Sequence, residues 1–535
     1  MAAPRVAFYV GALSLFTYLL YDYSSSFAPR CQYDNRCARF LTKSLLPGAP
    51  PTDVGDHQWR GFREKLTLLV PVAILHASCG ARIRTHRTRV AYDAAAGLAL
   101  ILFIHRAQAA HLLVLALLNY CLVGLLCAAL PKTAAEKATL VASWLFILSM
   151  LLLREYGRRP LKFGRLLGVS FAWLDRGHFG GMGWWDHANL LALRMHSHNI
   201  DQSAGQSRLR RGWWEYVAYL FYAPLYVAGP IMTSDDFSEQ SRKEGGAGGG
   251  SRKEGDDSVL VYAVRWICAL FVMELLSARA PCFALASVGS RLLLGSRSGG
   301  GIDDPSAAAS IGIGRLSASE SLVFSYLRLQ LVWLKFLIIW RFFTLWARFN
   351  GRSPPENLPA PSCSLFGFWN YSILGFWRSW HASFSRWLMI YLYVPLGGRE
   401  HRYRNLLATF GFVALWHGVE GRMFGWAALV MLSIAPEVAA SRFLDRHPGL
   451  RERWYHRHLV AACGATAICA LMLANLVGFG SGTAEEALRT VALIGESGAE
   501  GLRAAVVAWA LLFIGVHIML DLEAWRAAKQ EARVD

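Results

Sequence analysis

Two histidines in apolar surroundings are the residues of this chain best suited to chemistry. The first, His417, ends an apolar run in the segment 410–426 (FGFVALWHGVEGRMFGW) and precedes Gly418. A neutral imidazole is cheap to bury and still accepts a proton near pH 7, and a neighbouring glycine lets a substrate approach the ring. This pattern indicates a general base. A histidine that hydrogen-bonds a neighbouring helix is the alternative.

The second histidine, His381, lies in the segment 375–387 (GFWRSWHASFSRW). On one continuous helix the spacing predicts an aromatic face made of Trp377, Trp380, Phe384 and Trp387. A belt of Trp and Arg at the membrane interface is the alternative. The pairing of the histidines favours chemistry, because two such residues on neighbouring helices can converge, one as base and one as orienter or oxyanion donor.

Two histidines, a thioester and a hydroxyl acceptor are sufficient for acyl transfer. The base removes the hydroxyl proton, the alkoxide attacks the carbonyl, and the thiolate leaves without help because the pKa of a thiol is low. No covalent enzyme intermediate is required, and the sequence contains no Gly-x-Ser-x-Gly elbow.

A third group of histidines lies between residues 178 and 201. His196 and His198 have the spacing of a metal pair, but no carboxylate or further histidine follows at a ligand spacing. We therefore expect structural or cavity-lining roles for these two residues and for His187, and no metal site.

The elements that position these residues are apolar blocks. The chain has 535 residues, of which 54% are hydrophobic and only 17% charged, whereas soluble domains carry roughly a quarter charged residues. A membrane-spanning helix needs about 20 apolar residues. Apolar blocks occur near 6–21, 65–79, 90–105, 109–130, 138–153, 213–232, 259–288, 321–347, 364–377, 384–397, 404–418, 423–439, 458–479 and 503–521. This pattern predicts an all-α polytopic membrane protein with about 11–13 transmembrane or re-entrant helices.

Three regions divide the chain. Residues 1–55 are expected to form an uncleaved signal-anchor helix and a polar connection, residues 56–440 a catalytic core, and residues 441–535 C-terminal transmembrane helices. Glycine- and charge-rich stretches near 238–258 and 296–315 cannot bury a core and are predicted to be disordered loops.

Cysteine and charge give further expectations. Cys31 and Cys37 flank a short polar stretch after the first apolar block and form a disulfide if that stretch is lumenal. The net charge is +18, and arginines gather in short loops such as 82–89, 154–165 and 399–404. Basic loops that stay cytosolic are the simplest explanation. The alternative is that some of them hold an anionic, nucleotide-linked donor. We expect no nucleic-acid partner.

Three pieces of this sequence resemble the core signature of the membrane-bound O-acyltransferases. They are WRSWHAS at 377–383, YLYVPLGG at 391–398 and LWHG at 415–418, in this order. Upstream pieces resemble the glycerol-uptake-protein (Gup) branch, a relative of Hedgehog acyltransferase: DHQWRGFR at 56–63, NLLALRM at 189–195, NID at 199–201 and AGPIMTSDDF at 228–237. The resemblance runs from about residue 56 to residue 440.

The resemblance implies a multi-helix body around a tunnel, which acyl-CoA enters from the cytosol and the acceptor from the lumen or the bilayer. His417 matches the near-invariant histidine of the family, and His381 matches its second site. We expect substrate contacts from Trp380, Trp416, Arg378 and Glu420.

Three features qualify the match. Gly418 stands where many members of the Gup branch have Asp, and Ser234 stands where Phe is usual, which leaves the acceptor open. In Hedgehog acyltransferase a cysteine shortly before the second site holds a haem. Cys363 lies near that place at a different spacing, which speaks against haem here. No cofactor beyond the co-substrate acyl-CoA is expected.

The resemblance implies a lipid O-acyltransferase of the endoplasmic reticulum membrane. Its leading acceptor is a lyso-lipid in the remodelling of glycosylphosphatidylinositol (GPI) anchors. Protein acylation, as in Hedgehog acyltransferase, is the rival enzyme activity. A glycerol transporter is the alternative of another class, and the absence of an internal repeat counts against it. Retention of both histidines argues against an inactive scaffold.

Overall fold

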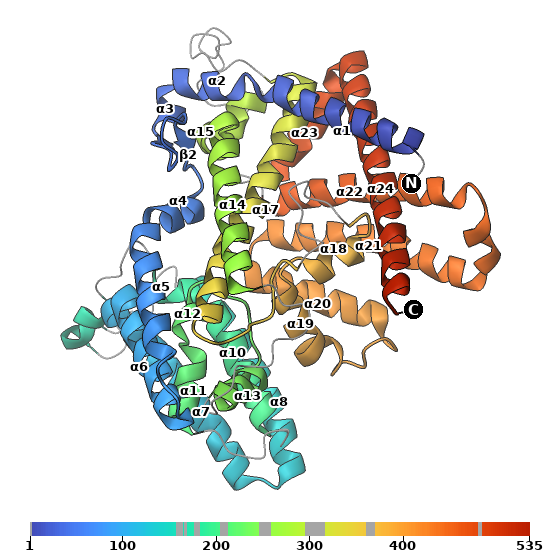
Figure 1. Cartoon of the computed structure of the whole chain (residues 1–535). Coiled ribbons are helices and arrows are strands. Elements are labelled where there is room, and N and C mark those ends of the chain that lie inside the picture. Colours follow the sequence, from blue (N-terminus) through green and yellow to red (C-terminus); the bar gives the residue numbers. More distant parts are fainter. Residues whose placement is uncertain are drawn as a thin grey trace.

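The computed structural model describes residues 3–156, 164, 168–175, 182–203, 212–244, 258–294, 316–359, 370–479 and 484–534. Almost all of these residues are helical (Figure 1). In this part of the chain the only sheet is an antiparallel pair, β1 (Leu41–Thr42) and β2 (Thr52–Asp53). The all-α prediction is confirmed.

The helices follow one another in two halves. The first half comprises α1 (Ala3–Ser24), α2 (Phe27–Tyr33), α3 (Asn35–Ala38), α4 (His57–Glu64), α5 (Leu66–Gly80), α6 (His86–His105), η1 (Arg106–Gln108), α7 (Ala109–Ala129), α8 (Lys132–Tyr156), η2 (Val169–Asp175), α10 (Trp184–Ser203), α11 (Trp213–Leu220), α12 (Ala223–Tyr226) and α13 (Ser234–Glu244). The second half comprises α14 (Val259–Arg279), α15 (Cys282–Leu294), α17 (Ala318–Phe349), α18 (Ile373–Ser379), α19 (Ala382–Leu388), η3 (Met389–Tyr393), α20 (Arg402–His417), α21 (Gly421–Arg446), η4 (Pro448–Glu452), α22 (His456–Phe479), α23 (Ala484–Glu496) and α24 (Gly498–Val534).

Eight helical segments of the described chain are long and apolar enough to cross a membrane. They are Arg5–Tyr33, His86–Ala129, Lys132–Glu155, Val259–Arg279, Ala318–Phe349, Gly421–Arg446, His456–Phe479 and Gly498–Lys529. The shorter helices α18, α19 and α20 lie among them (Figure 1). Many large apolar side chains are exposed on the long helices, as expected of surfaces that face lipid. The protein is a multi-pass membrane protein.

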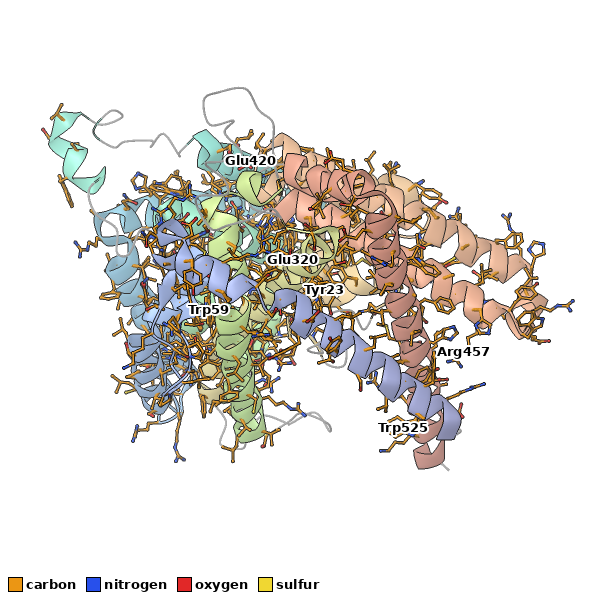
Figure 2. The ribbon with its side chains drawn as sticks, turned by 90° about the horizontal axis from the view of Figure 1, so that it is seen from above. Tyr23, Trp59, Glu320, Glu420, Arg457 and Trp525 are labelled. Carbon is orange, nitrogen blue, oxygen red and sulfur yellow. A yellow bond between two sulfur atoms is a disulfide. The ribbon has the colours of Figure 1, made fainter. Side chains whose placement is uncertain are left out.

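The N-terminal connection is packed against the membrane helices. Cys31 and Cys37 form a disulfide, which confirms that prediction. Arg30 pairs with Glu320 at the start of α17, 2.8 Å away, where Ser317 and Glu320 form a capping box. Figure 2 views the molecule from above and shows α1 running from this point to α24. There Tyr9 donates a hydrogen bond to Asp521 at 2.7 Å.

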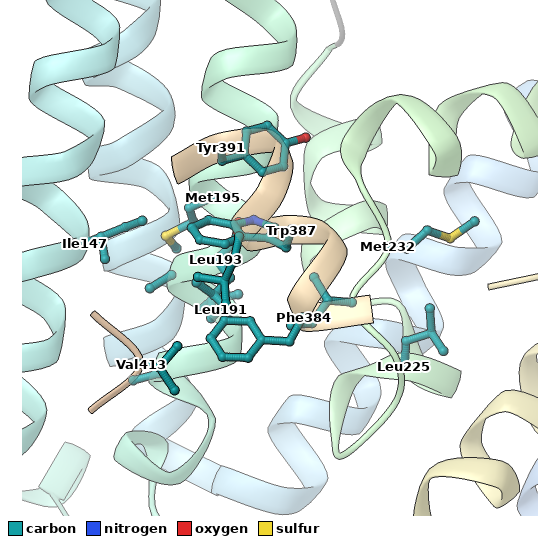
Figure 3. Close-up of a cluster of buried hydrophobic side chains, with 14 of the residues drawn as sticks. Ile147, Leu191, Leu193, Met195, Leu225, Met232, Phe384, Trp387, Tyr391 and Val413 are labelled. Atoms are coloured by element: carbon teal, nitrogen blue, oxygen red, sulfur yellow. The ribbon is translucent and has the colours of Figure 1, made fainter. Parts of the chain in front are cut away.

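One hydrophobic cluster lies where α8, α10, α19 and α20 meet (Figure 3). Trp387 of α19 is 1% exposed and its indole nitrogen donates to the carbonyl of Leu193 at 3.1 Å. Phe412 of α20 stacks on this indole, with ring centroids 5.9 Å apart. The cluster therefore fixes α19 and α20, whose ends carry the two candidate histidines.

Two sequence predictions are wrong in detail. The segment 375–387 is not one helix, because α18 ends at Ser379 and α19 begins at Ala382. His381 between them has φ 47°, so the aromatic side chains do not form one continuous face. The loop predicted near 238–258 begins later, since α13 continues to Glu244. Residues 245–257 and 296–315 lie outside the described residues.

Candidate active site

His417 is the last residue of α20. The chain leaves the helix through Gly418, whose φ of 157° is rare for residues that carry a side chain. Aromatic rings surround the imidazole, with centroids 4.9 Å away for Trp416, 5.1 Å for Phe479 and 6.0 Å for Trp426. The ring thus sits in an apolar pocket at a helix end.

His381 occupies the break between α18 and α19 in a left-handed conformation. Such a backbone is strained for a residue with a side chain, and strain of this kind gathers at functional sites. The imidazole stacks on the indole of Trp340 in α17, with centroids 4.7 Å apart and an interplanar angle of 16°. The break therefore turns the ring toward α17.

The two histidines line the same cavity, which has a volume of about 1230 Å³. Trp416 connects them, because its ring centroid lies 6.2 Å from that of His381 and 4.9 Å from that of His417. Within the described chain neither imidazole ring makes a hydrogen bond. The alternative of a histidine tied to a neighbouring helix by a hydrogen bond is therefore not what the described residues show, and both rings are open to a substrate.

Two polar side chains hold the end of α20 in place. Asn189 of α10 donates its amide N–H to the carbonyl of Trp416, and the Trp416 indole donates back to the carbonyl of Asn189 at 3.4 Å. Arg154 of α8 donates to the carbonyls of Trp416 and His417, at 3.2 and 3.4 Å. The carbonyls in the last turn of a helix have no partner within the helix. Because Asn189 and Arg154 donate to these carbonyls, they fix the position of His417.

Aromatic side chains line much of the cavity, while polar side chains gather at two ends and beside His417, where Arg154 and Asn189 also line it. One end carries basic side chains that we call the arginine rim: Arg378, Arg399, Arg402 and Arg442. The other carries Asp56, Gln58 and Lys335. Arg399 and Gln58 are both exposed, so the cavity reaches the surface at each end. In Figure 1, α4 lies toward the end of the molecule that carries α2 and α3, and α20 lies toward the other.

The structure brings most of the predicted substrate contacts together. Trp380, Trp416 and Arg378 line the cavity with the histidines. Glu420 is not among the lining residues. It precedes α21 and pairs with Arg422 at 2.5 Å. The haem candidate Cys363 lies outside the described residues.

The third group of histidines lies away from the cavity lining. His196 hydrogen-bonds Ser143 at 2.9 Å and His198 hydrogen-bonds Ser234 at 3.3 Å, while His187 stacks on Tyr226 with centroids 4.9 Å apart. These contacts fit structural roles. Among the described residues no three His, Cys, Asp or Glu side chains gather as metal ligands would.

Sequence reasoning missed three residues of the cavity. Lys335 is a cation near the centre of the apolar block 321–347, which also contains Arg328 and Arg341, and a cation at that depth is itself a signal of function. Trp377 was assigned to an aromatic face, but its indole nitrogen is buried without a partner in the described chain. Asn189 belongs to a family-like motif, and nothing in that motif indicates that it contacts α20.

The described chain is a largely helical, multi-pass body whose interior cavity is lined by two histidines, an arrangement that suits a membrane-embedded acyltransferase. Residues 317–481 match the model of the membrane-bound O-acyltransferase (MBOAT) family. The chain is similar to membrane-bound O-acyltransferase gup1 of Schizosaccharomyces pombe, with 28% identity over 90% of this chain and 82% of the relative. The corresponding GUP1 of Saccharomyces cerevisiae is 27% identical over 96% and 90%.

A more distant relative acts on protein. The mouse protein-cysteine N-palmitoyltransferase HHAT is 28% identical over 49% of each chain. These relatives establish the chain as an acyltransferase with an acyl donor and a lipid or protein acceptor.

Proposed function

We propose that this protein moves a fatty acyl group from acyl-CoA to the hydroxyl of a lyso-lipid in the endoplasmic reticulum membrane. The leading acceptor is a lyso-GPI lipid. The observation that carries the proposal is the convergence of His417 and His381 on one cavity, with an arginine rim at one opening. The Cys31–Cys37 disulfide supports the location, because disulfides form in oxidising compartments such as the lumen.

His417 acts as the general base in this proposal. Its imidazole makes no hydrogen bond in the described chain, so its nitrogen is available to the acceptor hydroxyl. The hydroxyl loses its proton to the imidazole as its oxygen attacks the thioester carbonyl, the C–S bond breaks, and the CoA thiolate leaves. His381 orients the acceptor from the far side of Trp416. Trp377 supplies an N–H to the carbonyl oxygen as negative charge develops there.

The arginine rim is suited to the donor. Arg399 precedes α20 and Arg402 is its first residue. Arg442 of α21 lies beside them, because its guanidinium donates to the Tyr403 hydroxyl at 2.8 Å. Guanidinium groups bind phosphate oxygens in a bidentate manner. The CoA phosphates therefore fit this opening, and the acyl chain fits the aromatic interior.

The experiment compares wild type with His417→Ala in detergent, supplied with radiolabelled acyl-CoA. The acceptors are lysophosphatidylinositol and a panel of peptides with free N-termini. We expect transfer to the lipid and at least ~10²-fold loss in the variant, the scale of general-base catalysis. The exposed His447 provides the control His447→Ala, which should transfer like wild type. Undiminished transfer by His417→Ala removes this residue from the mechanism.

Two rival functions give different results in the same experiment. Transfer to peptides in place of the lipid would assign the activity printed for the mouse relative. A glycerol carrier would move glycerol into proteoliposomes with no acyl transfer, and the flux would survive His417→Ala.

A further inference from the structure

A lysine lies in the middle of the longest candidate span around the cavity. Lys335 of α17 is 3% exposed and lines the cavity. Intramembrane cations are costly and mark functional sites by default. The catalytic proposal does not use this residue, so its presence needs another reason.

Lys335 is held by the N-terminal end of α4. Its ammonium donates to Asp56 Oδ2 at 2.8 Å and to Gln58 Oε1 at 3.1 Å. Burial alone would raise the pKa of Asp56, but the neighbouring ammonium holds that pKa below the ordinary value of an aspartate. The contact has the geometry of an ion pair, in which each charge compensates the other. A lysine ammonium has three N–H donors, so one remains beyond the two bonds to α4.

An amide whose oxygen has no partner among the described residues lies in the same cavity wall. Gln330 is 7% exposed and lines the cavity. Its side-chain Oε1 is buried and has no hydrogen-bond partner among the described residues. Buried polar atoms without partners are rare and call for an explanation, and an atom in a cavity wall acquires its partner when the cavity is filled.

This polar end leads to the histidines. The Lys335 ammonium lies 4.6 Å above the ring of Phe336, which stacks on Trp340 with centroids 5.0 Å apart. The indole of Trp340 in turn stacks on the imidazole of His381. Trp340 lies five positions after Lys335, which is roughly 7.5 Å along a helix axis. A headgroup at the polar end can therefore present a hydroxyl to the histidines.

We propose that this end of the cavity is a subsite for the polyhydroxyl headgroup of the acceptor lipid, such as a glycerol or inositol moiety. The polyol subsite consists of Asp56, Gln58, Gln330 and Lys335. Hydroxyls both donate and accept hydrogen bonds, so different hydroxyls of one headgroup can donate to the amide oxygen of Gln330 and accept the remaining N–H of Lys335. The inference rests on the proposed lipid acyl transfer.

The charges here disfavour a cationic acceptor such as a peptide N-terminus. Such an amine needs an uncompensated carboxylate. Among the described residues of this polar end, only Asp56 carries a carboxylate, and it is paired with Lys335.

The test removes the unpartnered amide. Gln330→Leu replaces it with an apolar side chain of similar size. The matched control is Thr139→Val, because the hydroxyl of Thr139 is also buried without a partner in the described chain and lies outside the cavity lining. Both variants are assayed with hexadecanol, monoacylglycerol and lysophosphatidylinositol as acceptors. Free glycerol and myo-inositol serve as competitors.

We expect Gln330→Leu to lower kcat/KM about 10-fold for the two polyol lipids through a raised KM, as loss of one buried hydrogen bond does. Hexadecanol should be transferred as by wild type, and Thr139→Val should match wild type with every acceptor. An equal loss with all three acceptors, or no loss, overturns the subsite. Competition by free glycerol or myo-inositol at millimolar concentration overturns its assignment to a lipid-borne headgroup.

An assay of acceptor binding in the absence of acyl-CoA distinguishes failure of this inference from failure of the proposed function. Tryptophan fluorescence of the purified protein reports binding of monoacylglycerol, because Trp340 and Trp380 line the cavity. If wild type transfers to no acceptor, the proposed function fails. Weaker binding by Gln330→Leu than by Thr139→Val then still supports the subsite, and equal binding overturns it.

Discussion

Replacing Asn189 with leucine tests whether the position of His417 depends on the contact between α10 and α20. The substitution keeps a branched side chain but removes the amide N–H that Trp416 accepts. A neutral hydrogen bond contributes about 0.5–1.5 kcal/mol to stability, and Arg154 still donates to the same carbonyl at 3.2 Å. The free energy of unfolding should therefore fall by only about 1 kcal/mol.

The effect on catalysis should be larger than the effect on stability. A displacement of about 1 Å in a reacting group costs up to ~10²-fold in rate. Since one donor to Trp416 remains, we expect kcat to fall ~10-fold with little change in the KM of acyl-CoA. Asn189 is in this respect a positioning residue, and the split between kcat and KM distinguishes it from a substrate contact.

Asn119 provides the matched control, because it is a buried asparagine outside the cavity lining. Its amide donates to Asn199 at 3.0 Å and to the Tyr216 hydroxyl at 2.8 Å, and accepts from Asn199 at 2.9 Å. Asn119→Leu should therefore cost more stability than Asn189→Leu but leave kcat per folded molecule unchanged. Thermal unfolding in detergent and steady-state kinetics measure both quantities. If the kcat of each variant simply follows its stability, the reasoning is refuted.

Three further predictions concern other parts of the chain. Trp377→Phe should keep the aromatic packing but remove the unpartnered N–H, lowering kcat ~10²-fold in the steady-state assay; an unchanged kcat would exclude this donor. Gly97→Ala should destabilise the protein by about 1–3 kcal/mol, because the new Cβ would lie 2.3 Å from the carbonyl oxygen of Phe221. The control Gly124→Ala places its Cβ where nothing lies within 4 Å, and it should be neutral or stabilising in thermal unfolding. Cys31→Ser should lower stability by about 2 kcal/mol, and reductant should then shift the melting temperature of wild type but not of the variant.

Much of the fold can be predicted from the sequence, because membrane helices are recognisable by their length and apolar composition. The helix break at His381 does not, since helical periodicity continues through it and only the backbone φ of 47° shows the interruption. The polar end of the cavity does not either. Lys335 bonds to Asp56, 279 positions away in the chain, and such a pairing has no local signature.

The break at His381 also explains signature residues that perform no chemistry. A helix interrupted at membrane depth exposes backbone groups that must be satisfied within the protein. The N–H of Ala382 donates to the carbonyl of Asn357 at 2.9 Å, and Ser383 donates to the side chain of the same asparagine.

Ser383 also binds the segment that follows the Gly-Pro motif. Its hydroxyl accepts the backbone N–H of Ile231 at 2.9 Å. The His-Ala-Ser piece and the Ala-Gly-Pro-Ile-Met piece, which are far apart in sequence, therefore meet at one hydroxyl. The serine keeps the broken backbone hydrogen-bonded, and this allows the strained histidine to lie against Trp340 rather than continue a helix. Replacement of this serine would thus disturb His381 through the backbone, without any contact between the serine and a substrate.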